Sequence, residues 1–397
     1  MRRRALLHVG AGLAGAALLA PLLPARRARA EASAYRKVDA APLRRAFAPP
    51  AQAPELLLAF ARWLNAEAPP GLPLADGLSG DDGEWTARFN DYWIEEGADL
   101  SETFAIFLAI GDGGDVALWN RDGGPSAQWP VVLIGGEGEA VVLADSFAGF
   151  LARLATAQFD EPDAGEAGWF SWSEFQTGIE NDAEDTSAEA RADLAAARRA
   201  RQALGEWLRR QTGQDDLAAL ARRRVPRDAL RQRFDTHMKA VHERQRASAD
   251  WRALRALVQP DRPKGYRGSY DDLHVVCADD FFRVGTMSRR GRRFVPYARS
   301  AEIEPLIRAL REDRARRFPA HGLWFHARLR VYTADTASDP QQPGLVDLIA
   351  QYLDDASDMS WLPRPPAAAI RADCARRPRS EWWTPGWLKA VLAKPPS

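Results

Sequence analysis

Apolar and polar positions follow two different spacings along the chain, and each spacing predicts a type of element. Between Glu55 and Glu67, apolar residues recur every three or four positions, as in an amphipathic helix. Four short apolar runs, separated by turns rich in glycine and acidic residues, predict strands at 104–110, 116–120, 129–134 and 139–144. Asp145-Ser146 then suits the start of a helix. These elements predict an α+β domain over residues 50–160.

The second half begins helical and then changes its spacing. One predicted helix runs from Thr186 to Gly213, and another follows Pro226 with Leu230, Phe234, Met238 and Val241 on one face. Beyond Pro260 the period becomes two, which predicts strands at 273–278, 281–287, 293–298 and 323–332, with a helix at 303–316. The predicted fold class is therefore α+β: a sheet flanked by helices, then a helical segment and a second α+β unit. The expected division is 1–30 leader, 31–49 tether, 50–160 first domain, 161–186 acidic linker, 187–260 helical region and 261–397 basic α+β domain.

The first thirty residues have the pattern of an export signal. Arg2, Arg3 and Arg4 precede an apolar run rich in alanine, glycine and leucine, and Ala28-Arg29-Ala30 is a small-residue cleavage site. The paired arginines and the glycine-diluted apolar run are typical of the twin-arginine route. We therefore expect a periplasmic or secreted protein. An uncleaved signal that anchors the chain in the membrane and a general-secretion signal are the alternatives.

Charge is distributed unevenly, although 54 Lys+Arg balance 54 Asp+Glu over the 397 residues. Residues 31–190 hold 8 Lys+Arg against 29 Asp+Glu, whereas residues 191–397 hold 40 against 25. An acidic first half and a basic second half suggest two units that attract each other, or partners of opposite charge. After residue 30, no stretch approaches the roughly 20 apolar residues of a membrane span. With 46% hydrophobic and 27% charged residues, the composition excludes wholesale disorder.

The two cysteines have two interpretations. Outside the cytoplasm, Cys277 and Cys374 are a possible disulfide that would close a long loop. The alternative is a pair of buried thiols, because Cys277 lies in the apolar run Val275-Val276-Cys277-Ala278. The sequence favours neither.

The first domain resembles a known family over about fifty residues. The resemblance rests on the strand run 104–120, on Trp129-Pro130-Val131-Val132-Leu133 with the turn 136–139, and on the segment Ala144–Leu151. Their order and spacing are similar to the second half of SMI1/KNR4 (SUKH) domains. A Leu-Pro…Asn-Gly-Gly segment typical of the family's first half is not found. The resemblance implies a non-enzymatic, protein-binding domain of the kind that often serves as an immunity protein and neutralises a toxin.

No sequence motif indicates catalysis. The histidines after the leader do not form a metal-binding motif, and neither a nucleophile elbow nor a phosphate-binding loop occurs. We expect no catalytic residue, no metal and no cofactor, while an enzyme site in the unrecognised second half stays an alternative. The basic turn Ser288–Arg293 suits a polyanion, but the export signal argues against nucleic acid as its partner.

A binding surface is predicted where aromatic and acidic residues occur together. Aromatic side chains supply binding energy, and carboxylates speed the encounter with a basic partner. The candidate residues are Trp93, Glu95, Glu96, Asp99, Glu102 and Trp119. The sequence thus predicts an exported immunity-type protein that binds a protein partner, such as a basic toxin domain. A cell-envelope scaffold or regulator that uses the same domain as an adaptor is the main alternative.

Overall fold

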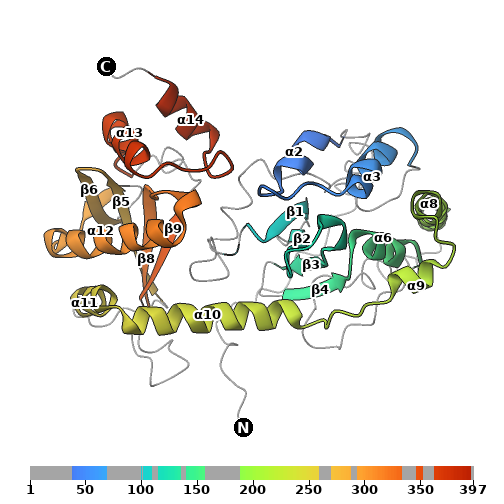
Figure 1. The fold of residues 1–397 in the computed structure, drawn as a ribbon, viewed down its shortest axis with the longest axis horizontal. Helices are drawn as coiled ribbons and strands as arrows, with labels where there is room; N and C mark the ends of the chain where they lie inside the picture. The colour runs from blue at the N-terminus through green and yellow to red at the C-terminus, as the bar shows by residue number, and fades with distance from the viewer. Residues whose placement is uncertain are drawn as a thin grey trace, which may run out of the picture. The chain divides into compact units, whose positions relative to one another are not determined.

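A computed structural model describes residues 38–68, 100, 102–109, 115–135, 140–156, 188–258, 270–287, 293–332, 346–351 and 362–394 (Figure 1). The chain divides into two compact units. The N-terminal unit comprises the described residues between 38 and 235 except Leu100, and the C-terminal unit comprises Leu100 and the described residues from Thr236 onward. The boundary falls within helix α10 (Ala229–Ala247). The leader, the acidic linker and the basic turn at 288–292 lie outside the described residues.

The N-terminal unit is built on a four-stranded antiparallel sheet in the order β1-β2-β3-β4. Its strands are β1 (Phe104–Ala109), β2 (Asp115–Trp119), β3 (Val131–Ile134) and β4 (Ala140–Ala144), with the short helix η1 (Ser126–Gln128) before β3. Every residue of β2 and β3 is buried, so the continuous apolar runs reflect a sheet covered on both faces. The four strands predicted from the sequence are confirmed.

Helices pack on one face of this sheet around a cluster of aromatic side chains. They are α2 (Ala40–Arg45), α3 (Glu55–Ala66), α6 (Phe147–Thr156), α8 (Ala188–Thr212) and α9 (Leu217–Ala221). Phe60 of α3 lies 5.9 Å from Phe147 of α6 and 5.7 Å from Trp207 of α8, measured between ring centroids. Three helices that are far apart in sequence therefore share one core.

Two predicted boundaries are wrong because of this core. Residues 38–49 do not behave as a tether, since Leu43 and Phe47 are buried and Phe47 stacks on Trp129 at 5.8 Å. Helices α8 and α9 do not form a separate helical region, because Leu204, Trp207 and Leu208 belong to the same core as α3 and α6. Leu204, Trp207 and Leu208 face one side of α8 and need an apolar surface to cover them.

Polar contacts connect α6 and β4 to the segment around α9. The Ser146 hydroxyl accepts a hydrogen bond from the Gly149 N–H at 3.1 Å, as a helix N-cap does. The Asp145 carboxylate accepts hydrogen bonds from the backbone N–H groups of Arg224 and Val225. A Cβ at Gly149 would lie 3.0 Å from the backbone oxygen of Leu220, so glycine allows α9 to approach α6 closely.

The C-terminal unit is built on a five-stranded antiparallel sheet in the order β7-β6-β5-β8-β9. Its strands are β5 (Tyr270–Ala278), β6 (Phe281–Met287), β7 (Phe294–Pro296), β8 (His326–Tyr332) and β9 (Val346–Gln351). Its helices are α11 (Ala249–Val258), α12 (Ser300–Arg317), η2 (Pro319–His321), α13 (Ala367–Arg376) and α14 (Gly386–Ala393). Among the described residues, no helix is long and apolar enough to cross a bilayer.

The two faces of this sheet differ in chemistry. Leu273, Val275 and Cys277 of β5 share a hydrophobic core with α11 and α12. Asp272 and His274, which alternate with these residues, lie on the opposite face. One end of that face is apolar, because Ala278 packs with Phe325, with Ala369 and Ile370 of α13, and with Leu388 of α14. The predicted mixed α+β class is therefore correct for both units.

Candidate functional site

Four of the predicted binding residues, Trp93, Glu95, Glu96 and Asp99, lie outside the described residues. Glu102 is exposed in the turn that precedes β1. The structure therefore places one predicted carboxylate at the surface of the N-terminal unit.

Trp119 is a core residue, which corrects its prediction as a partner-binding residue. Its side chain is only 3% exposed and stacks on Phe104 with 6.3 Å between ring centroids and an interplanar angle of 11°. Phe104 in turn contacts Phe234 of α10. Trp119 ends β2, and the pairing Phe104↔Trp119 places the two rings side by side across the ladder.

Both cysteines are free thiols in the structure: Cys277 is buried and Cys374 is half-buried. Cys277 is buried in the core shared with α11 and α12, whereas Cys374 of α13 packs against the cluster around Ala278. Adjacent residues of a strand point to opposite faces of the sheet, so the two thiols belong to different clusters. Burial raises the pKa of both thiols, which disfavours the reactive thiolate.

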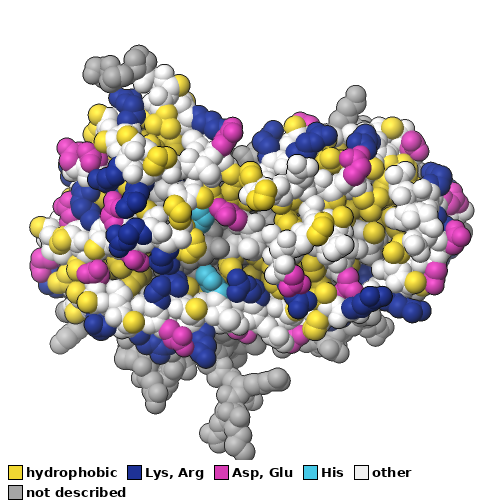
Figure 2. All heavy atoms as spheres, in the orientation of Figure 1, with side chains coloured by type: hydrophobic (Ala, Val, Ile, Leu, Met, Phe, Trp, Pro, Cys, Tyr) yellow, Lys and Arg dark blue, Asp and Glu magenta, His cyan; other side chains and the backbone are white. Residues whose placement is uncertain are grey.

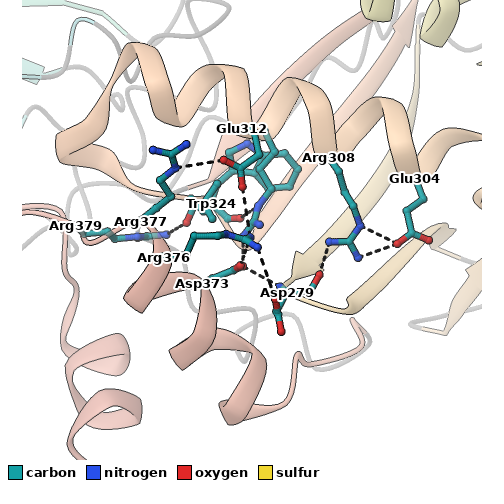
Figure 3. A network of polar contacts seen from close by, with 11 residues as sticks. Asp279, Glu304, Arg308, Glu312, Trp324, Asp373, Arg376, Arg377 and Arg379 are labelled. Carbon is teal, nitrogen blue, oxygen red and sulfur yellow. Dashed lines mark hydrogen bonds and ion pairs between the residues drawn. The ribbon is translucent and has the colours of Figure 1, made fainter.

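A network of polar contacts in the C-terminal unit joins α12, α13 and the β5–β6 turn (Figure 3). Arginine and carboxylate side chains alternate in it: Glu304, Arg308, Arg311 and Glu312 come from α12, Asp279 from the turn, and Asp373 and Arg376 from α13. Arg377 and Arg379 follow α13; Arg377 pairs with Glu312, and Arg379 donates to the backbone oxygen of Leu323. Figure 2 shows the same mixture at the visible face of this unit, where Lys and Arg side chains alternate with acidic ones.

Asp373 is the centre of this cluster. Its Oδ2 accepts hydrogen bonds from Arg311 Nη2 at 2.6 Å and from the Asp279 backbone N–H at 3.0 Å, while its Oδ1 accepts one from Arg376 Nη2 at 2.6 Å. The Asp373 side chain is 0% exposed and that of Arg311 is 2% exposed. A buried carboxylate thus has partners on three elements, as a buried charge requires.

Two histidines form a second polar feature, on the less apolar face of the same sheet. His274 Nδ1 and His326 Nε2 lie 3.2 Å apart, and the ring planes differ by only 10°. The ring centroids are 5.5 Å apart. With the two nitrogens only 3.2 Å apart, the centroids can be this far from each other only if both nitrogens lie close to the line that joins the ring centres. This straight geometry suits a hydrogen bond and not two ligands of one metal ion, whose lone pairs would converge on a point beside that line.

Burial keeps both imidazoles neutral. The pKa of His274 is lowered to about 4 and that of His326 to about 3, mainly by desolvation on burial, with a smaller contribution from the Arg328 guanidinium to both. The Asp272 carboxylate opposes the shift at His274 but is itself held by Arg330 at 2.9 and 3.2 Å. Neutral imidazoles can donate and accept hydrogen bonds, so the pair holds β5 to β8 as a polar contact within the sheet.

No described group of three or more His, Cys, Asp or Glu side chains is arranged to hold a metal ion. A scan against protein-family models, a search of curated proteins and a search of solved structures found no match to this chain.

The arginine–carboxylate cluster was not among the residues singled out from the sequence. Arg311 and Asp373 are 62 residues apart, and neither belongs to a motif. The one local signal is that arginine recurs along α12 on the side that also carries Ile303, Ile307 and Leu310, where a solvated charge is not expected.

Proposed function

We propose that this protein is an exported, non-enzymatic binding protein of the immunity type, whose N-terminal unit recognises a basic protein partner. The observation that carries the proposal is the ordered run of elements over residues 104–156. Four antiparallel strands are followed by a helix that starts at Ser146-Phe147. The same order, over the same residues, is what the resemblance to SMI1/KNR4 domains implies.

The surface proposed for binding is the acidic segment Asp91–Glu102. Its described end, Glu102, is exposed immediately before β1. Acidic residues next to an aromatic side chain combine electrostatic steering with an anchor that is buried on binding. Trp93 is the aromatic anchor of this proposed surface, because Trp119 belongs to the core.

The first experiment captures partners from cell-envelope extracts, and candidate toxins encoded beside the gene, on the immobilised mature chain. For a partner obtained in this way, reversing the charges of Glu95 and Glu96 to lysine should slow association by about tenfold at low salt. The matched control reverses Glu67 and Asp215, two exposed acids of the N-terminal unit outside the segment. Equal slowing by both pairs of substitutions would assign the effect to net charge and would contradict the surface.

Trp93→Ala should change the rate of dissociation and not the rate of association. If Trp93 is the buried anchor, its loss should speed dissociation at a cost of about 2 kcal/mol or more, while circular dichroism stays that of the folded protein. An unfolded variant would place Trp93 in the core and remove it from the surface. A folded mature chain that captures no partner at all would favour the scaffold alternative.

Export is tested separately. Replacing Arg3 and Arg4 with lysine should leave precursor in the cytoplasm, because the twin-arginine route requires the arginine pair. Fractionation followed by immunoblotting measures this distribution. Unchanged export would point to the general-secretion route, and membrane-bound full-length chain would point to an uncleaved anchor.

A further inference from the structure

A strongly basic stretch connects α9 to α10 in the N-terminal unit. Residues 222–233, here called the arginine segment, contain six arginines and a single acidic residue, Asp228. Figure 2 shows Lys and Arg side chains gathered where this connection runs in Figure 1. Like charges this close together repel one another, so the cluster does not stabilise the fold. Its exposed members are Arg222, Arg224, Arg231 and Arg233.

The first half of the arginine segment is fixed to the edge of the N-terminal sheet. The backbone oxygen of Val142 in β4 accepts a hydrogen bond from Arg223 Nη1 at 2.9 Å. The Asp145 carboxylate accepts one from the backbone N–H of Arg224 at 2.7 Å. Because Arg223 points at β4, the side chains of its neighbours Arg222 and Arg224 point away from the sheet and are exposed. The fold therefore holds these two guanidinium groups outward on a rigid edge.

The second half of the segment begins α10. Arg231 and Arg233 lie near the start of this helix, and its first turn contains no acidic residue. The N-terminal end of a helix carries partial positive charge, so arginine is unfavourable there. Asp228, the one acid of the segment, accepts a hydrogen bond from the Gln232 amide at 2.7 Å. These arginines are therefore not placed to stabilise α10.

The charge of the segment is not neutralised within the fold. In the part of the chain that the structure describes, the guanidinium groups of Arg222, Arg224 and Arg233 form neither an ion pair nor a hydrogen bond. The C-terminal unit differs, because Arg308 and Arg377 each pair there with a carboxylate of α12. An exposed cluster of unpaired cations offers its charge to an anionic partner.

We propose that the arginine segment binds an anionic membrane surface, and that the phosphate groups of acidic phospholipids supply its counter-charge. The other exposed residues of the segment are Pro226, Asp228 and Gln232, so it recognises charge alone. Protein partners and single-stranded nucleic acids are usually held by aromatic or apolar anchors as well. A dense layer of lipid phosphates needs only clustered cations. The expected export signal also puts a membrane, and not duplex nucleic acid, beside the mature protein.

This surface is independent of the acidic segment proposed above for a protein partner. Opposite charges can serve separate partners on one protein because salt screens them from each other. The Debye length is about 8 Å at physiological ionic strength, so the local arginines and not the balanced net charge decide what binds at residues 222–233.

The first test measures how the mature chain, without residues 1–30, sediments with lipid vesicles. The leader is left out because its own arginines and apolar run would bind lipid. Vesicles of equal parts phosphatidylglycerol and phosphatidylcholine should bind the chain about tenfold or more tightly than phosphatidylcholine alone. This binding should largely disappear between 0.1 M and 1 M salt, where the Debye length falls from about 10 Å to about 3 Å.

Substitutions then locate the surface. Replacing Arg222, Arg224 and Arg233 with glutamine should weaken binding by about 100-fold, because each arginine near an anionic membrane contributes about fivefold. The melting temperature should not fall, since these guanidinium groups have no partner in the described fold. Lysine at the same three positions should keep binding within about threefold, because a lipid surface attracts charge and does not require the planar guanidinium. The matched control replaces three exposed arginines elsewhere in the N-terminal unit with glutamine: Arg44, Arg62 and Arg121.

A second measurement needs no substitution. Hydrogen exchange of the mature chain with anionic vesicles should slow in peptides that cover residues 222–233 and stay unchanged in peptides of α12. This pattern would place the lipid contact on the segment even if a variant were to lose its fold.

Four results would overturn the proposal. Anionic vesicles that do not bind the chain would exclude a membrane surface. An equal loss in the control triple would assign binding to net charge. A lysine triple as weak as the glutamine triple would indicate a partner that requires guanidinium geometry. Tighter binding of a duplex oligonucleotide than of vesicles, at equal phosphate concentration, would assign the segment to nucleic acid.

Discussion

The two sheets of this protein differ in the kind of side chain that packs on their faces. In the N-terminal unit, β2 and β3 are buried along their whole length, and aromatic side chains of α3, α6 and α8 fill the core on one face. In the C-terminal unit, one face packs on α11 and α12, while the other carries the His274–His326 pair and the Asp272–Arg330 pair. Helix α13 packs at the end of that face through Ala369 and Ile370 and through the buried Asp373 carboxylate.

This difference implies two kinds of stability. Apolar burial is nondirectional and does not depend on protonation, so the N-terminal unit should be insensitive to mild acid. Buried polar groups depend on the charge state and the geometry of each partner, so the C-terminal unit should respond to pH and to single polar substitutions. The predictions below test this contrast.

The largest effect is expected at Trp207, which α8 contributes to the N-terminal core. Its ring stacks on Trp63 at 5.4 Å and its side chain is 4% exposed. Trp207→Ala should lower the free energy of unfolding of the N-terminal unit by about 3–5 kcal/mol, since it leaves a large cavity. Urea unfolding followed by hydrogen exchange of α3 and α6 peptides measures the loss, with Trp207→Phe as the milder control. Unchanged exchange in α3 and α6 would show that α8 is not part of this unit.

Acid should destabilise the C-terminal unit by a somewhat smaller amount. The folded-state pKa of His274 is about 4, below the ordinary value of 6.5, so the unfolded chain binds the proton first. Stability is therefore present above pH 6.5 and falls as the pH drops toward 4, by up to about 3 kcal/mol for this residue. His326, with a pKa of about 3, adds a loss in the same direction that also begins near pH 6.5 and continues to about pH 3.

This pH dependence is measured by hydrogen exchange of β5 and β8 peptides between pH 7 and pH 4. His326→Phe should make the profile shallower but not flat, because it removes one of the two buried imidazoles and leaves His274 desolvated. Peptides from α3 and α6 serve as the internal control and should change little over the same range. Equal acid sensitivity in both units would contradict the contrast between them.

The smallest effect is expected at an exposed ion pair of the C-terminal unit. Asp313 pairs with Arg316 and Arg317 on α12, and its side chain is 49% exposed. Asp313→Ala should change the free energy of unfolding by about 0.5 kcal/mol or less, because solvent screens the pair. Thermal unfolding at low and high salt measures this. A loss as large as that of Asp373→Ala would mean that burial does not distinguish the two carboxylates.

Local elements could be predicted from the sequence where one apolar pattern had one explanation. The apolar run 131–134 led to the correct strand, because a strand buried on both faces is apolar at every position. The spacing from Glu55 to Glu67 led to the correct helix, because a helix buried along one stripe is apolar at every third or fourth position. The tail beyond Pro363 showed no such period, and α13 and α14 were not predicted. Their buried residues, such as Ala369 and Leu388, are too few to produce a repeating pattern.

The candidate sites were harder to predict than the elements. Trp119 is of a residue type that often anchors binding surfaces, yet its position opposite Phe104 in the ladder buries it. Arg311 and Asp373 read as two ordinary charges on two helices, and only the packing of α13 against the β5–β6 turn brings them to 2.6 Å. Residue type indicates what chemistry is possible, whereas burial decides whether it faces a partner or the core.

The sequence alone determined the α+β class, the order of the strands and helices with strong periodicity, and the opposite charge of the two halves, because each of these depends on neighbouring residues. The tertiary structure decided that α8 and α9 complete the N-terminal core, that the two cysteines lie in different clusters, and that one buried carboxylate connects α13 to α12 and to the β5–β6 turn. These features arise between residues that are tens of positions apart. The contacts that create them have no local signature, since their free energy comes from desolvation and geometry that exist only after the chain has folded.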